Sequence, residues 1–355
     1  MIKLLIVDDS ALMRRQLATL FNDEGGFEVR LARNGSEGVQ ENRDFQPDVI
    51  TLDINMPEMD GLTALSIMMT ERPVAVVMFS SLTAKGALAT FEALNLGAVD
   101  YIVKPGGTIS LSIEDVREQI IAKVRVAAKA RLKSSKALAS AAPAPRSVAK
   151  AAPARMPDSR LSPTSEGVVI VGVSTGGPST LERILPDLSA DFPWPILIAQ
   201  HMPASFTLSF SQRINEMCAL HVVEVNRPMS LEAGTVYIAK GGADMVLVRR
   251  AGKLMVIAKP ESSAYLWHPS VEVLGRSALD HLTPKQIVGV MLTGMGNDGA
   301  EAFTAIKNQG GRTIAESEES SVVFGMPGEL IKRGGATVTL HAEKIASQMT
   351  AWLAY

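Results

Sequence analysis

The sequence predicts two α/β domains, each built on a doubly wound parallel sheet. At 355 residues the chain is longer than one ordinary hydrophobic core supports. Short apolar runs alternate with segments of helical apolar spacing in both halves, which is typical of parallel sheets covered by helices. Between about residues 134 and 166, Ala, Pro, Ser and Lys without apolar periodicity indicate a tether. We therefore expect domains at residues 1–125 and 166–355, joined by a helical extension and an Ala/Pro/Lys-rich linker over 126–165.

The first domain is expected to hold buried strands that alternate with helices. Its strands are nearly continuous apolar runs, as burial on both faces requires, at residues 2–7, 49–52, 74–79 and 99–103. Segments with apolar residues at helical spacing follow them, at residues 10–22, 61–70, 85–96 and 116–126. This alternation predicts a flavodoxin-like domain.

The second domain repeats the alternation without an internal sequence repeat. Its expected strands lie at residues 168–173, 196–199, 287–292 and 313–315. Residues 237–239 and 245–257 indicate a hairpin inserted among these strands. We therefore expect a Rossmann-like α/β domain that carries an inserted hairpin.

Composition excludes several classes of protein. Apolar residues make up 46% of the chain, too many for a mainly disordered or fibrous protein. The 35 Lys and Arg against 37 Asp and Glu argue against general nucleic-acid binding. The single cysteine, Cys218, forms no internal disulfide and no zinc framework. Because no apolar run suits a membrane span or a signal peptide, we expect a cytoplasmic protein without membrane insertion.

The region that joins the domains is basic. Residues 117–160 contain eleven Lys or Arg and two acidic residues, Glu118 and Asp158. Such a segment either attracts an acidic partner or membrane surface, or is a soluble linker that its like charges keep extended. The composition favours the second interpretation and leaves the first open.

Polar side chains follow the strands of the first domain where each strand ends: Asp8, Asp9, Asp53, Ser80 and Lys104. In a parallel sheet these ends meet at one edge, where ligands bind. Three carboxylates there would repel one another unless a hard cation such as Mg²⁺ lay among them. A lysine and a hydroxyl can hold a phosphoryl group, and the turn after Asp53 leaves that carboxylate exposed as a nucleophile. Taken singly, Asp-Asp is often a helix cap and Lys-Pro often closes a loop.

In this order the polar residues resemble the receiver domain of two-component response regulators, over residues 1 to about 125. The resemblance implies that Asp53 accepts a phosphoryl group from a histidine kinase, with Mg²⁺ bound by Asp8, Asp9 and Asp53. Receiver domains carry a rotating aromatic residue at the position of Tyr101, but a simple role in core packing would explain an aromatic residue there equally well. The residues that the resemblance assigns to the receiver switch are Ser80, Tyr101 and Lys104.

A glycine-rich turn carries the first chemical signal of the second domain. The Gly-x-Ser-x-Gly pattern at residues 172–176 puts Ser174 on a tight turn between a strand and a helix, with its hydroxyl projecting. The start of that helix is electropositive and suits an oxyanion. The alternative is a phosphate-binding loop for a dinucleotide. Because the glycines do not fit Gly-x-Gly-x-x-Gly, the pattern favours a serine nucleophile.

A serine nucleophile needs a base and an orienting acid. His201 follows the apolar run 196–199 and so ends a strand at the same sheet edge. Asp298 lies in a loop with three glycines after the run 287–292, where a plain helix-capping turn is the alternative. The other histidines lie in a loop or in less distinctive segments: His221, His268, His281 and His341. Ser, His and Asp on three strand-end loops favour catalysis.

The chain order Ser–His–Asp differs from the Ser–Asp–His order of α/β-hydrolases. Four motifs follow the receiver-like domain: Ser-Thr-Gly-Gly at 174–177, Gln-His-Met-Pro at 200–203, Leu-Thr-Gly-Met-Gly-Asn-Asp-Gly-Ala at 292–300 and Val-Phe-Gly-Met-Pro at 323–327. Together they resemble the chemotaxis protein-glutamate methylesterase (CheB) family. The likeness covers both domains and leaves out only the linker.

The resemblance implies hydrolysis of γ-glutamyl methyl esters on chemoreceptors and deamidation of particular receptor glutamines. Ser174 would attack the carbonyl, His201 would carry the proton, and Asp298 would orient the imidazole. The backbone N–H of Thr175 could bind the oxyanion, and Met295 is the family's other candidate. The resemblance implies no metal or cofactor for this reaction.

Regulation by obstruction is also implied. An unphosphorylated receiver packed over the Ser174 edge would exclude a receptor helix, and phosphorylation of Asp53 would shift the population of that arrangement. Two rival classes are a phosphorylation-switched binding module with a degenerate hydrolase domain, and a transcriptional regulator. The intact Ser–His–Asp set argues against the first, and the lack of a basic helix-turn-helix pattern argues against the second.

The chain departs from the family pattern at two positions. His268 stands where many relatives carry Arg, and Glu272 stands where they carry Asp. These departures put substrate contacts at that loop in question.

Overall fold

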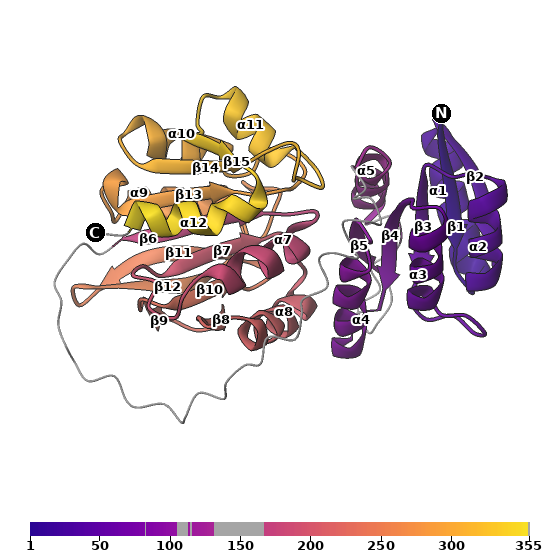
Figure 1. Cartoon of the computed structure of the whole chain (residues 1–355), viewed down its shortest axis with the longest axis horizontal. Helices are drawn as coiled ribbons and strands as arrows, with labels where there is room; N and C mark the ends of the chain where they lie inside the picture. Colours follow the sequence, from indigo (N-terminus) through magenta and orange to yellow (C-terminus); the bar gives the residue numbers. More distant parts are fainter. Residues whose placement is uncertain (82, 105–112, 114–115, 131–166, 354–355) are drawn as a thin grey trace.

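The computed structural model describes all residues except 82, 105–112, 114–115, 131–166 and 354–355. Most of the predicted linker, 126–165, therefore lies outside the described residues. Figure 1 shows two lobes, each with a sheet between helices, which confirms the predicted fold class. The predicted boundaries at residues 125 and 166 stay a prediction, and α5 (Arg117–Ala127) runs across the first of them.

The N-terminal sheet has, within the described residues, five parallel strands in the flavodoxin-like order β2-β1-β3-β4-β5. The strands are β1 (Ile2–Val7), β2 (Phe27–Ala32), β3 (Val49–Asp53), β4 (Ala75–Ser80) and β5 (Asp100–Val103). The helices are α1 (Ala11–Glu24), α2 (Gly35–Asp44), α3 (Gly61–Glu71), α4 (Ala84–Asn95) and α5. Strand β2 was not among the predicted strands, because this edge strand buries only Phe27 and Ala32 and has no continuous apolar run.

Polar side chains fix where the first four helices begin. Ser10, Asn34, Asp60 and Thr83 each accept a hydrogen bond from the backbone N–H three residues further on. Such a cap satisfies a donor that the first helical turn leaves free. The caps at Ser10 and Asp60 thereby also fix the loops after β1 and β3.

The C-terminal sheet has, within residues 167–353, seven parallel strands in the order β15-β14-β13-β6-β7-β10-β8. These are β6 (Val168–Val173), β7 (Ile196–Gln200), β8 (His221–Val225), β10 (Thr235–Ala239), β13 (Ile287–Met291), β14 (Arg312–Glu316) and β15 (Val338–Leu340). The helices are α7 (Gly177–Ile184), α8 (Ala204–Met217), α9 (Val271–Leu279), α10 (Ala300–Asn308), α11 (Met326–Lys332) and α12 (Ala342–Leu353). None of the helices in the described parts of the chain is long and apolar enough to cross a membrane.

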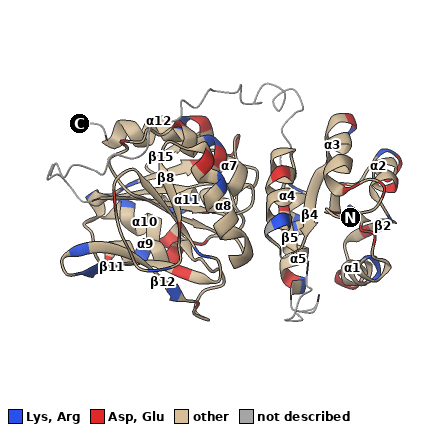
Figure 2. Ribbon diagram, turned by 90° about the horizontal axis from the view of Figure 1, so that it is seen from below, with Lys and Arg blue, Asp and Glu red and all other residues tan. Residues whose placement is uncertain are grey.

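The inserted hairpin differs from the predicted one in its first strand. β10, predicted as part of the hairpin, is a buried parallel strand between β7 and β8. The hairpin consists instead of β11 (Ala243–Arg250) and β12 (Lys253–Pro260), and β12 also pairs with β9 (Met229–Ser230), which gives a separate antiparallel sheet. Its turn at Ala251 and Gly252 has positive φ at both residues, and the basic tip points away from the N-terminal domain (Figure 2).

Strand β6 shows how helices cover both faces of the C-terminal sheet. All six of its residues are buried. Val168 and Ile170 pack in one cluster with Leu274 of α9, whereas alternate residues from Val169 to Val173 pack in another with side chains of α7, α8 and α12. Each fully buried Val or Ile side chain contributes about 1.5–3 kcal/mol to the stability of this sheet.

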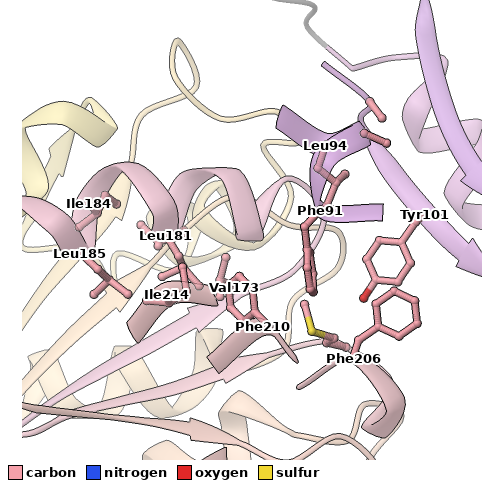
Figure 3. Packing of buried hydrophobic residues seen from close by; sticks show 14 of the residues in the cluster. Phe91, Leu94, Tyr101, Val173, Leu181, Ile184, Leu185, Phe206, Phe210 and Ile214 are labelled. Carbon is pink, nitrogen blue, oxygen red and sulfur yellow. The ribbon is translucent and has the colours of Figure 1, made fainter. Parts of the chain in front are cut away.

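The two domains meet through α4 and β5 on one side and α7 and α8 on the other (Figures 1 and 3). Aromatic side chains form the centre of this contact. Tyr101 of β5 stacks on Phe206 of α8 with ring centroids 4.9 Å apart, and Phe91 of α4 lies 5.5 Å from Phe210 of α8. The hydrophobic core of the first domain therefore continues into the second.

Candidate active site and phosphorylation site

Three neighbouring strands of the C-terminal sheet end in the predicted catalytic residues. Ser174 follows β6, His201 follows β7, and Asp298 lies between β13 and α10. Because β6 lies between β13 and β7, the three loops adjoin at the carboxyl edge of the sheet. His201 Nε2 lies 2.8 Å from Asp298 Oδ2, with both side chains almost completely buried.

The Asp298 carboxylate is held in its charged form. Burial alone would raise its pKa, but the hydrogen bond and charge of His201 and the backbone N–H groups of Val271 and Glu272 outweigh burial and lower the pKa. These N–H groups belong to the start of α9 and lie 2.7 and 3.0 Å from the carboxylate oxygens. Ser270, the N-cap of α9, donates its hydroxyl to Asp298 Oδ1 at 3.0 Å.

Ser270 is a residue that the sequence analysis did not assign to the site. A serine before an apolar helical stretch is a usual cap signal, so its place on α9 was accessible from the sequence. Its contact with Asp298 was not, since the two residues lie 28 positions apart.

The remaining nitrogen of the imidazole is left free. Since His201 Nε2 is bonded to Asp298, its Nδ1 is the atom left to accept a proton, and this buried Nδ1 has no hydrogen-bond partner. Ser174 and His201 share no hydrogen bond within the described structure. Ser174 is only 9% exposed, so the predicted projecting hydroxyl is largely covered in this arrangement of the chain.

Close backbone packing fixes the turn that carries Ser174. Its N–H donates to Thr293 O at 3.0 Å, and its carbonyl accepts from Gly177 N at 2.8 Å and from Gln200 Nε2 at 3.0 Å. Gly176 has a φ of 77°, and a side chain there would also meet Val322 at 2.6 Å. The turn between β6 and α7 therefore requires glycine at this position.

The loop that carries Met295 is pinned by the 323–327 motif. Gly294 N donates to Val323 O, and Gly294 O accepts from the N–H groups of Gly325 and Met326 at 3.0 and 2.9 Å. Within the described residues, the backbone N–H groups of Thr175 and Met295 have no hydrogen-bond acceptor. Both predicted oxyanion donors are therefore unpaired.

The predicted acidic residues of the N-terminal sheet also converge. Asp8, Asp9 and Asp53 each offer a carboxylate oxygen, and these atoms all lie within 4.8 Å of one another. Lys104 Nζ lies 2.9 Å from Asp8 Oδ2 and 2.7 Å from Asp53 Oδ2. The oxygen-only donor set suits a hard cation such as Mg²⁺.

Asp53 is buried, so the predicted exposure of its carboxylate is wrong. Its side chain is 4% exposed, because it lies at the buried end of β3 in contact with Lys104. Burial raises the pKa of Asp53 and the charge of Asp8 adds to this, although Lys104 opposes both. Burial would lower the pKa of Lys104, but Asp53 and Asp8 together outweigh it and raise that pKa.

Ser80 and Tyr101 lie on the side of the receiver sheet that faces the other domain, at β4 and β5. Ser80 Oγ donates to Gly86 O at 3.2 Å and accepts from Thr90 Oγ1 at 2.8 Å, so its hydroxyl is bonded to α4. The Tyr101 hydroxyl is buried without a hydrogen-bond partner, and burial together with nearby Asp100 holds its pKa well above the ordinary value. The structure thus gives Tyr101 both a core position and an unpaired hydroxyl at the contact.

Comparison with known proteins agrees with this arrangement. Residues 169–349 match the family described as CheB methylesterase, and residues 4–113 match the response regulator receiver domain. A protein-glutamate methylesterase/protein-glutamine glutaminase of Rhodospirillum rubrum is 56% identical over 99% of this chain and 96% of that protein. The chain belongs to the CheB methylesterase family.

One further relative covers both domains, and one solved structure covers the catalytic domain. A protein of the same name from Vibrio cholerae is 44% identical over 98% of this chain and 96% of its own length. Among solved structures, the CheB methylesterase catalytic domain of Thermotoga maritima has a TM-score of 0.52 at 35% identity and covers 54% of this chain and 100% of that chain. The family and fold predicted from the sequence are confirmed.

The receiver domain contacts the turn that carries the candidate nucleophile. Thr175 Oγ1, next to Ser174, donates to Asp100 Oδ2 of the receiver at 2.6 Å. Lys123 Nζ bonds the other oxygen of Asp100 at 2.8 Å. Asp100 was not among the predicted site residues. No local pattern could indicate it, because Thr175 lies 75 residues away along the chain.

The two departures from the family pattern have structural partners in the methylesterase domain. His268 Nδ1 lies 3.0 Å from both carboxylate oxygens of buried Asp244. Glu272 Oε2 accepts from the N–H of Ala302, and its other carboxylate oxygen pairs with Arg276 at 2.7 Å. Both residues therefore anchor α9 and the loop before it, beside the candidate active site.

Proposed function

We propose that Ser174 is the nucleophile, His201 the general base and Asp298 the orienting carboxylate of this protein-glutamate methylesterase and protein-glutamine glutaminase. The activity follows from the family and from relatives that match over the full length. The observation that supports the residue assignment is the 2.8 Å contact of His201 Nε2 with Asp298, which leaves Nδ1 free to accept a proton.

The reaction is acyl transfer in two halves. Ser174 Oγ attacks the side-chain carbonyl of a methylated glutamate or a glutamine, and its proton passes to His201 Nδ1. That proton then passes to the departing methoxide or amide nitrogen, which leaves as methanol or ammonia. Water attacks the resulting acyl-enzyme with the same base, releasing glutamate and restoring the serine hydroxyl.

The oxyanion of each tetrahedral intermediate would be bound by backbone N–H groups. Those of Thr175 and Met295 are unpaired and lie on loops beside Ser174. Removing one such donor typically costs about 10²–10³ in kcat. Every step proposed for hydrolysis uses groups of the protein and water.

The proposed protein substrates are methyl-accepting chemoreceptors, and the proposed phosphodonor is a chemotaxis-type histidine kinase. Family membership supports receptor substrates and a kinase in general terms. Because the signalling helices of such receptors and such a kinase lie in the cytoplasm, we place the protein in the cytoplasm.

In the receiver domain, Asp53 is the proposed phosphoryl acceptor. Asp8, Asp9 and Asp53 would hold Mg²⁺, which neutralises charge on the phosphoryl oxygens during transfer. Lys104 would then exchange its contact with Asp53 Oδ2 for a phosphoryl oxygen. This exchange is the proposed start of the switch.

Phosphorylation would act on catalysis by uncovering the edge that carries Ser174. The Asp100–Thr175 hydrogen bond and the stacking of Tyr101 on Phe206 hold the receiver over that edge. Ser80 is bonded to α4, which packs on α7 and α8, and Tyr101 is part of the contact, so a change at Lys104 has a route to the interface. A receptor helix and the receiver would compete for the same surface.

Release of methanol from methylated receptor membranes tests the residue assignment. Ser174→Ala and His201→Gln should each lower kcat by about 10⁶-fold, because members of a triad act as one unit. Ser189→Ala, at an exposed serine of the same domain, is the matched control and should keep the wild-type rate. A Ser174→Ala protein that released methanol at the wild-type rate would refute the assignment.

A further inference from the structure

The face of the candidate catalytic histidine is covered by an aromatic ring. The rings of His201 and Trp267 are stacked with centroids 4.9 Å apart and planes within 7° of parallel. Asp298 approaches His201 in the plane of the imidazole, so the ring is restrained at its edge by one residue and at its face by another. We propose that Trp267 is a positioning residue, which holds the plane of His201 and stabilises its protonated form during proton transfer.

Trp267 is held in place by the same segment that holds Asp298. Its neighbour His268 is anchored to Asp244, and the N–H of Ser270 donates to Asp244 Oδ1 at 2.8 Å. Ser270 also bonds Asp298. One short stretch of chain therefore sets the position of both groups that restrain His201.

The loop before Trp267 does not share this anchoring. Leu266, directly before it, is 91% exposed, whereas Trp267 is half-buried. Its indole nitrogen lies 4.0 Å from the position that a Cβ on Gly296 would occupy. The indole therefore extends from the His201 ring toward the loop that carries Met295.

The stack suits a ring that gains a positive charge. When His201 takes the proton of Ser174 it becomes an imidazolium, and the face of an indole attracts a cation through its quadrupole. Because this charge grows as the serine attacks, the attraction lowers the barrier more than it stabilises bound substrate. A parallel ring also limits rotation of the imidazole out of the plane shared with Asp298.

This inference rests on the proposed role of His201, so its test includes a reading without turnover. In the full-length protein, indole fluorescence is followed between pH 4.5 and 8, and the signal of Trp267 is the difference between wild type and Trp267→Phe. The stack predicts that acid changes this signal in wild type and that the change disappears in His201→Gln. Trp352→Phe, at a tryptophan packed on Arg312 instead, is the control and should keep the change.

Measurements of kcat then distinguish a role of the aromatic face of Trp267 from a role of its side-chain volume. With phosphodonor present, Trp267→Ala and Trp267→Leu should each lower kcat for methanol release by about 10-fold with KM nearly unchanged, and Trp267→Phe should stay within about 3-fold of wild type. The thermal unfolding midpoint of each variant is compared with that of wild type, to show that all three variants are folded. A Trp267→Leu protein with wild-type kcat, or a pH-dependent signal that persists in His201→Gln, would overturn the proposal.

Discussion

The carboxyl edges of the two sheets both hold a buried carboxylate, but its negative charge is balanced in different ways. Asp298 in the methylesterase domain accepts from two backbone N–H groups at the start of α9, from Ser270 and from His201. Asp53 in the receiver domain is balanced mainly by one side chain, that of Lys104. The pKa of Asp298 is lowered and that of Asp53 is raised.

The site of Asp298 is therefore fixed, whereas the site of Asp53 can change. Backbone N–H groups in a helix start cannot move away without unfolding the helix, so Asp298 has one stable arrangement. A lysine side chain can exchange one anion for another, as the proposed binding of a cation and a phosphoryl group at the Asp53 cluster requires. The first arrangement suits catalysis and the second suits a switch.

Replacing the fixed carboxylate, Asp298, should give the largest loss of activity. Asp298→Asn should lower kcat by about 10⁴-fold, because an amide cannot hold His201 in the tautomer that leaves Nδ1 free to accept a proton. Kinetics of methanol release measure the effect. Asp244→Asn, at the carboxylate that pairs with His268, should cost far less; equal losses would mean that the two His–Asp pairs are not distinguished by function.

Weakening the contact between the domains should raise activity. Asp100→Asn reduces the charge that receives the Thr175 hydroxyl and Lys123, and a charge-assisted hydrogen bond is worth about 1.5–3 kcal/mol. We therefore expect the unphosphorylated protein to hydrolyse esters about 10-fold faster. Asp23→Asn, at an exposed position on α1, is the control. An unchanged basal rate would show that Asp100 does not hold the receiver over the site.

A further effect of the Asp298 carboxylate concerns stability at acid pH. Because the folded pKa of Asp298 is lowered below its unfolded value, its charge stabilises the fold above about pH 3.8. This contribution is lost as the pH falls through the lowered folded pKa. At pH 6, Asp298→Asn should cost about 2 kcal/mol in urea unfolding, and the difference from wild type should shrink below pH 3.8. A difference that stayed constant to pH 3 would contradict this.

The sequence predicted the parts of both sites that lie at strand ends. Ser174, His201 and Asp298 each follow an apolar run, and in a parallel sheet that position alone places them at one edge. The same reasoning collected Asp8, Asp9 and Asp53. Periodicity failed at β2 and β10, because an edge strand has few buried residues and a short buried strand resembles half of a hairpin.

Other contributors could not be found from local pattern. Ser270 and Trp267 reach the site because α9 packs beside β6, a tertiary contact. Asp100 meets Thr175 only because the domains dock. The burial of Asp53 was also missed, since it depends on Lys104 folding over the sheet edge.

In the proposed switch, the receiver covers the Ser174 edge until phosphorylation of Asp53 uncovers it. The most direct test follows methanol release from methylated receptor membranes by wild type, Ser174→Ala and Asp53→Ala, each with and without a small-molecule phosphodonor. We expect wild type alone to accelerate with the phosphodonor, Asp53→Ala to keep a low constant rate, and Ser174→Ala to release no methanol. Equal rates for wild type and Asp53→Ala with the phosphodonor present would contradict the account.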